Sequence, residues 1–210
     1  HGQYYINLNA QEAATLKASV KRVLEAAERA WECGAWSLCF HMAYNMGLPE
    51  EKVYENVKKQ VKEIVKKLKD SGNDIWLRPE TGGKLSQFAN EDYLIKLSEE
   101  VEQVLPCIDW AHQHARSNGK VNDKKSFGAI LEKIEAKLGK EALQNMHMHI
   151  EGIEYSEKGE KNHVNFDECE FNYRDLMKVW KDFKIRGAAI SESPNIEGDA
   201  LNARKAYEKA

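Results

Sequence analysis

The chain has 210 residues, of which 42% are hydrophobic and 31% charged, enough for one globular domain with a buried core and short for two. Its formal net charge of -3 indicates no overall attraction to nucleic acid, but a local patch or bound dications can still reverse the field at one site. No run approaches the ~18 apolar residues of a membrane span, so we predict a protein that binds no membrane. No secretory signal opens the chain, and the four cysteines form no CxxC pair. We therefore predict a reduced, cytoplasmic protein.

A short apolar run, a polar or glycine-containing loop and a long amphipathic helix recur along the chain. The apolar runs are as long as strands, and several are apolar nearly throughout, which is typical of strands buried on both faces of a parallel sheet. The predicted strands are residues 35–40, 74–77, 105–108, 145–150 and 187–190. Helical stripes of apolar residues run through 16–31, 53–68, 127–138 and 176–183.

Turn residues stand where this alternation needs them. Gly34, Gly72 and Gly139 follow predicted helices as C-cap residues, and Pro49 stands at a helix start. Strands that alternate with helices predict a parallel sheet with right-handed crossovers, and no low-complexity linker divides the chain. We therefore predict one α/β domain over residues 1–210.

Each predicted strand carries, within its C-terminal part or just after it, a side chain that can bind a metal. These residues are His41, Glu80, Asp109 with His112, His147, and Glu192. In parallel α/β folds the loops after the strands converge, so functional sites form at the carboxyl ends. Histidine and carboxylate without cysteine suit catalytic zinc, manganese or iron, and clustered carboxylates would repel one another without bound cations.

Single members of this set have simpler interpretations. Asp109 alone is more often a helix cap or a hydrogen-bonded polar group than a ligand. His149, one strand period after His147, either points inward or is an ordinary polar residue that leads into the loop. The prediction of a metal site rests on the whole set.

Several short motifs occur in a fixed order along the chain. They are His1-x-x-Tyr4-x-Ile6-Asn7-Leu8, Phe40-His41, Glu80-Thr81 before Gly82-Gly83, Ile108-Asp109-x-x-His112, Met146-His147, the later His163, and Glu192-Ser193-Pro194. In this order the chain resembles the endonuclease IV family of apurinic/apyrimidinic endonucleases, particularly its archaeal-type relatives, over essentially its whole length. The resemblance implies a (β/α)8 TIM barrel with divalent metals at its C-terminal mouth, zinc being expected and manganese or iron the alternatives.

The resemblance also implies a role for each matching residue. His1, His41 and Glu80 would bind one metal, and Glu80 would bridge to a second. The other ligands of the second metal would be Asp109, His147 and Glu192, and His112 and His163 would hold a third.

The implied reaction is hydrolysis of the phosphodiester on the 5′ side of an abasic site in DNA. Paired dications lower the pKa of bound water and clamp the attacked phosphate, with Glu80, Asp109 and Glu192 as the central carboxylates. Tyr4 and Tyr5 match positions near which the family inserts side chains at the lesion, where such wedges offset lost base stacking. Their other interpretation is packing at the barrel rim.

The chain departs from the family pattern in two places. Lys161 stands two residues before His163, where the family has an aspartate, and Glu160 could substitute from one residue further back. A complete barrel typically needs ~250 residues, so we predict about five full βα units, with the first strands of the barrel absent ahead of His1. An open barrel would expose strand edges, which predicts association with another chain.

A rival hypothesis uses the same architecture. Sugar isomerases and epimerases on related barrels bind one divalent metal with two glutamates, an aspartate and a histidine, and Glu80, Glu192, Asp109 and His147 would suffice for that site. The surplus histidines favour the nuclease, whereas Lys161 and the absence of an obvious basic surface favour the isomerase.

Overall fold

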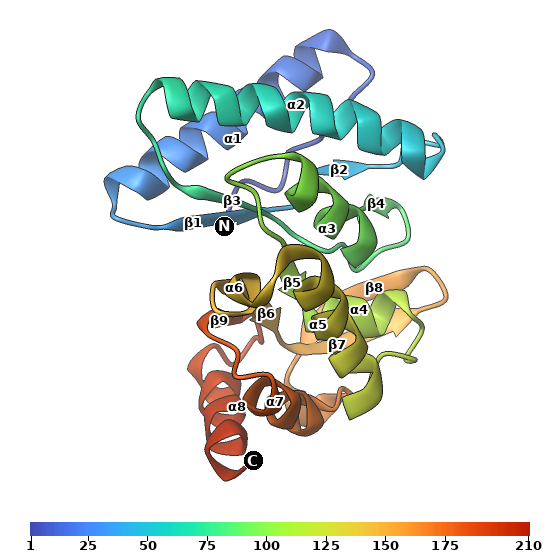
Figure 1. Ribbon diagram of the computed structural model, residues 1–210. Coiled ribbons are helices and arrows are strands. Elements are labelled where there is room, and N and C mark those ends of the chain that lie inside the picture. Colours follow the sequence, from blue (N-terminus) through green and yellow to red (C-terminus); the bar gives the residue numbers. More distant parts are fainter. The chain divides into compact units, whose positions relative to one another are not determined.

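The computed structural model describes residues 1–210, which fold into two compact units (Figure 1). The first unit comprises residues 1–81 and 86–107, and the second comprises residues 82–85 and 108–210. No helix is both long enough and apolar enough to span a membrane.

The first unit is built on two parallel strands under two long helices. β1 (Ser37–Phe40) pairs in parallel with β3 (Trp76–Pro79), and α1 (Ala13–Glu32) and α2 (Glu50–Asp70) lie side by side on one face of these strands (Figure 1). The apolar stripes of both helices meet Leu38, Phe40 and Leu77 in one buried cluster. Polar side chains that project from these strands toward a site therefore lie on the opposite face. The remaining elements are α3 (Glu91–Glu100) and the short antiparallel pair of β2 (Ala43–Tyr44) with β4 (Gln87–Phe88).

Local sequence explains the bounds of α2. Pro49 is its N-cap, acidic side chains occupy its first turn and lysines its last turn, in agreement with the helix dipole. Gly72 follows the helix at φ 74°, a left-handed conformation that glycine adopts without a steric penalty. The predicted helix over 53–68 is therefore confirmed and extended by a few residues at each end.

The second unit carries a sheet of order β5–β6–β9. β5 (Cys107–Asp109) contributes Ile108 and Asp109 to this unit, β6 (Met146–Ile150) is fully buried, and β9 (Gly187–Ser191) pairs in parallel with β6. The helices are α4 (Trp110–Arg116), α5 (Lys124–Leu138), α6 (Lys140–Leu143), α7 (Tyr173–Asp182) and α8 (Glu197–Lys209), with the 3-10 turn η1 (Phe166–Glu168). An antiparallel hairpin of β7 (Gly152–Ser156) and β8 (Gly159–Val164) follows β6.

The structure differs from the sequence-based expectation in several strand bounds, in the exposure of β9 and at one hairpin. The third predicted strand begins at Cys107 rather than at residue 105, and the second runs to Pro79 rather than ending at residue 77. β9 is not buried on both faces, because it is the edge strand in the sheet order and Ile190 is 45% exposed. The hairpin was not predicted, because residues 152–164 are rich in charge and offer no apolar run.

Candidate metal-binding sites

In the first unit, two histidines surround one buried carboxylate. Glu80 follows β3, is fully buried, and its backbone N–H donates to the Phe40 carbonyl at 3.0 Å. Its Oε2 lies 2.9 Å from His1 Nε2 and 3.8 Å from His41 Nε2. Burial alone would lower the pKa of His1, but the hydrogen bond and charge of Glu80 raise it to about 9. Two imidazoles and one carboxylate are a donor set typical of catalytic zinc.

Close backbone packing positions His1 beside this carboxylate. The Gly2 N–H donates to the Cys39 carbonyl at 2.7 Å, which ties the first residues to β1. A Cβ at Gly2 would stand 3.0 Å from the Cβ of Phe40, tighter than ordinary contact. Cys39 also belongs to this neighbourhood, since donor atoms of His1, Cys39 and Glu80 lie within 4.8 Å of one another.

In the second unit, an aspartate and a glutamate face one histidine. His149 Nδ1 lies 3.5 Å from Glu192 Oε1 and 3.9 Å from Asp109 Oδ2. Asp109 is also the N-cap of α4, since its Oδ1 accepts the His112 N–H at 2.7 Å. The capping interpretation of Asp109 is therefore confirmed, and its second oxygen still faces His149.

A further acidic residue, Glu151, lies among these groups. It is fully buried, and its Oε1 is 3.8 Å from His163 Nε2. Burial, and the charges of Asp109 and Glu192, raise the pKa of Glu151, while His149 acts in the opposite direction. Carboxylates packed this closely hold protons unless cations balance them. Glu151 was not among the residues selected from the sequence, although it directly follows an apolar strand, as the selected acids do.

A second group in the same unit joins α4 to the hairpin. Glu160 Oε2 lies 3.6 Å from His112 Nε2, and Glu160 Oε1 lies 3.9 Å from His163 Nε2. The loop before Ser86 closes over this group, because a Cβ at Gly83 would stand 2.6 Å from Glu160 Oε2 and 2.7 Å from His112 Cδ2. Glu160, not Lys161, is the carboxylate beside both histidines.

A β-bulge explains this spacing. Asn162 pairs with Glu154 and Glu160 pairs with Tyr155, so Lys161 is the extra residue of β8. The bulge interrupts the alternation of side chains, and residues 160 and 163 reach the same site although three positions separate them. Lys161 is exposed.

The structure therefore groups the predicted residues as follows: His1, His41 and Glu80 in the first unit, and Asp109 with Glu192, and His112 with His163, in the second. His149 lies beside Asp109 and Glu192, and His147 lies one strand period earlier, with the centroids of the two imidazole rings 5.3 Å apart. Tyr4 and Tyr5 are 75% and 81% exposed, which is not what packing at a rim predicts.

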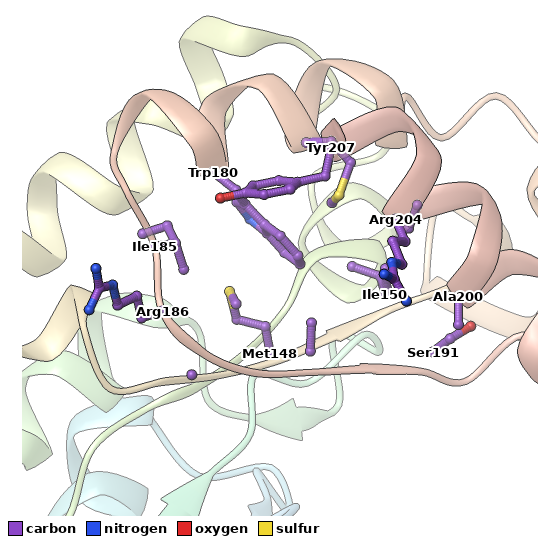
Figure 2. A pocket seen from close by; sticks show the side chains of 13 residues that line it. Met148, Ile150, Trp180, Ile185, Arg186, Ser191, Ala200, Arg204 and Tyr207 are labelled. Atoms are coloured by element: carbon purple, nitrogen blue, oxygen red, sulfur yellow. The ribbon is translucent and has the colours of Figure 1, made fainter. Parts of the chain in front are cut away.

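An apolar cavity of about 350 Å³ lies elsewhere in the second unit. Met148 and Ile150 line it from β6, and Trp180 and Tyr207 project into it from α7 and α8 (Figure 2). Since side chains alternate along a strand, this is the face of β6 opposite to that of His149. The cavity is therefore separate from the histidine and carboxylate groups.

Comparisons with known proteins agree with this architecture. The chain matches the xylose isomerase-like TIM barrel family over residues 1–210. It is 44% identical over 207 residues to the uncharacterised protein MJ0133 of Methanocaldococcus jannaschii, covering 99% of this chain and 75% of that protein.

Two solved structures have similar folds at low identity. A D-tagatose 3-epimerase-like protein has a TM-score of 0.74 at 17% identity, and the match covers 100% of this chain and 74% of that protein. Endonuclease IV from Thermus thermophilus has a TM-score of 0.72 at 17% identity, with coverages of 100% and 75%. The predicted TIM-barrel fold class is confirmed, and the same fold serves both an endonuclease and epimerase-like proteins.

Proposed function

Because the chain belongs to the xylose isomerase-like TIM barrel family, we propose that it is a divalent-metal-dependent hydrolase that cleaves the phosphodiester at abasic sites in DNA. The observation that carries the proposal is the group of His112, Glu160 and His163. A sugar isomerase of related fold needs one set of two glutamates, an aspartate and a histidine, and has no use for a second group rich in histidine. The substitution of Glu160 for the expected aspartate keeps a carboxylate between the two imidazoles.

The donor chemistry of both units fits divalent cations. Imidazole nitrogens and carboxylate oxygens without thiolate in the second unit suit zinc, with manganese or iron as alternatives. When bound, such ions lower the pKa of water and clamp phosphate oxygens, which is the chemistry that phosphodiester hydrolysis needs. The carboxylates would come from Glu80, Asp109 and Glu192. The imidazoles would come from His1, His41, His149, His112 and His163.

The exposed rings of Tyr4 and Tyr5 support a nucleic-acid substrate. His1 stacks on Tyr4 with ring centroids 5.5 Å apart, so this ring lies next to the first metal-ligating group. Stacking of a base on an aromatic side chain contributes roughly 1–3 kcal/mol. Exposed aromatic rings beside a catalytic group can therefore replace the stacking that an extruded nucleotide loses.

The decisive experiment measures incision of a duplex that carries one abasic site. We expect cleavage by the purified protein with added zinc or manganese, and loss of cleavage with a chelator and in Glu80→Gln. Glu63→Gln, on the exposed face of α2, is the matched control and should cleave normally. Undiminished incision by Glu80→Gln would contradict the assignment of Glu80 as a metal ligand.

The group of Asp109, His149 and Glu192 keeps a second candidate function open. It contains two acids and one histidine, and the D-tagatose 3-epimerase-like protein shares the fold. His163→Gln separates the two functions, because a single-metal epimerase would keep its turnover of ketoses without this side chain. A hydrolase that uses the second group would lose most of its incision.

A further inference from the structure

The apolar cavity of the second unit has no role in the proposed hydrolysis. Its volume is about 350 Å³, and it lies between the sheet and the helices α7 and α8 (Figure 2). Small-molecule sites have volumes of roughly 300–1,000 Å³ and combine apolar walls with a few polar groups. We propose that this cavity binds a small amphipathic carboxylate, which has an apolar body and one negatively charged end. The site is additional to the histidine and carboxylate groups.

The walls of the cavity suit an apolar body. Met148 and Ile150 line it from β6, and Met177, Trp180 and Tyr207 line it from the two helices. Methionine side chains adapt to ligands of irregular shape. Because a water molecule, which is similar in size to a methylene group, occupies roughly 30 Å³, the cavity holds on the order of ten non-hydrogen atoms. Octanoate is a carboxylate of that size.

Two polar groups of the lining need an acceptor. Trp180 is only 6% exposed, and its Nε1 is buried without a hydrogen-bond partner. The Oγ of Ser191, which also lines the cavity, is buried without a partner as well. An indole N–H can only donate, and a buried donor that is left unmatched is costly. A ligand with acceptor oxygens would remove this cost, whereas a hydrocarbon would not.

The charge of the lining favours an anion. Arg186 and Arg204 line the cavity on opposite sides in Figure 2, and no acidic side chain lines it. Arg204 Nε lies 3.0 Å from Glu208 Oε1, but both side chains of this pair are largely exposed, so the pair leaves the guanidinium available to a ligand. The planar guanidinium matches a carboxylate through paired N–H donors. A carboxylate therefore fits both the charge and the donors of the cavity.

A ligand can reach the cavity from solvent. Ala189 of β9 and Ala200 of α8 belong to the lining and are exposed, and their side chains are small. β9 is the edge strand of its sheet. Entry beside this strand therefore requires no helix to move.

The first test compares three ligands on the unmodified chain. Octanoate, octylammonium and octan-1-ol are titrated by calorimetry, each below the concentration at which it forms micelles. We expect one octanoate per chain, bound about tenfold or more tightly than the other two, because only octanoate combines acceptor oxygens with negative charge. Absence of octanoate binding, or equal affinity for octylammonium, would overturn the proposal.

Methionine methyl signals in NMR spectra locate the ligand. On addition of octanoate, the signals of Met148 and Met177 should shift, because both side chains line the cavity. The signals of Met42 and Met46, in the first unit, should stay in place. Unchanged signals of Met148 and Met177 at saturation would place the ligand elsewhere and overturn the proposal.

A double variant tests the role of the arginines. Arg186→Gln with Arg204→Gln should weaken octanoate binding about tenfold or more, and should change the affinity for octan-1-ol much less. Arg174→Gln with Lys178→Gln is the matched control, since it removes two exposed cations of α7 that do not line the cavity. Equal octanoate affinity in the two double variants would contradict the role of the arginines. Because every readout is ligand binding, the outcome is independent of whether the chain cleaves DNA.

Discussion

His149 Nδ1 lies 3.5 Å from Glu192 Oε1, although 43 positions separate the two residues in the sequence. The parallel register of β6 and β9 creates this proximity, since His149 is opposite Ile190 and Glu192 follows two positions later on the same face. The Glu192 N–H also donates to the Ile150 carbonyl at 3.0 Å, which fixes the start of the loop after β9. The register therefore places His149 beside the carboxylate that follows β9.

The first prediction concerns these two histidines. His149→Gln should weaken the binding of zinc by about tenfold or more, because it removes a nitrogen that faces two carboxylates. His147→Gln is the matched control on the same strand and should change zinc affinity much less. Competition with a fluorescent zinc chelator measures both values. A larger loss in His147→Gln than in His149→Gln would show that the register does not determine the ligand.

The second prediction concerns the bulge in β8. Glu160→Gln should lower the zinc content after dialysis by up to one equivalent per chain, because the amide is a weaker ligand than the carboxylate between His112 and His163. Lys161→Gln should leave the zinc content unchanged, since this side chain is exposed at the bulge. Glu157→Gln, at the exposed tip of the hairpin, controls for the loss of one negative charge. Elemental analysis gives the metal-to-protein ratio directly.

The strands and helices could be predicted because each depends on a local pattern of apolar residues. The strand-end acids Glu80, Asp109 and Glu192 were found in the same way, as polar residues that follow an apolar run. His149 was left with two interpretations, because the direction of a side chain near a strand end depends on the pairing partner as well as on local composition. Glu151 directly follows β6, so the same pattern of an acid after an apolar run could have identified it.

The bulge, and the proximity of Cys39 to Cys107, could not be predicted from the sequence for a different reason. The position of Lys161 depends on the pairing of β7 with β8, and no local residue pattern marks which residue becomes the bulge. Cys39 and Cys107 are neighbours only because β1 and β5 flank β3. Such long-range proximity is a property of strand order, which one sequence alone does not show.

The third prediction concerns the loop over the second histidine group. Gly83→Ala would place a Cβ 2.8 Å from Glu160 Cβ and 2.7 Å from His112 Cδ2, so we expect the two side chains to be pushed apart and the zinc content to fall as in Glu160→Gln. Gly128→Ala, in α5, is the matched control, because its new Cβ would meet its nearest neighbour only at 3.8 Å. That control should stabilise the protein by roughly 0.5–1 kcal/mol, as expected for alanine in a helix interior. Normal zinc content in Gly83→Ala would mean that the loop can move without disturbing the group.

The last prediction concerns a buried carboxylate in the first turn of α8. Asp199 is 1% exposed and accepts hydrogen bonds from the Phe166 N–H at 2.7 Å and the Asn202 amide at 3.2 Å. Burial alone would raise the pKa of Asp199, but the hydrogen bonds from Asn195, Phe166 and other donors outweigh it and lower the pKa. Asp199 therefore stabilises the fold above the pKa of an unfolded aspartate, about 3.9, and this stabilisation is lost as the pH falls through its lower folded-state value.

Asp199→Asn should accordingly lower the free energy of unfolding at neutral pH by about 1–3 kcal/mol, the usual cost of weakening a buried, charged hydrogen-bond network. Urea unfolding at neutral pH and at a series of acidic values measures this difference. The difference in the free energy of unfolding between wild type and variant should become smaller as the pH falls, because the Asp199 carboxylate of the wild type becomes protonated and loses its charge. Asp167→Asn, an exposed acid in η1, should show a much smaller difference at every pH. A gap between wild type and Asp199→Asn that stays constant down to low pH would mean that shape, rather than charge, explains the contribution of Asp199.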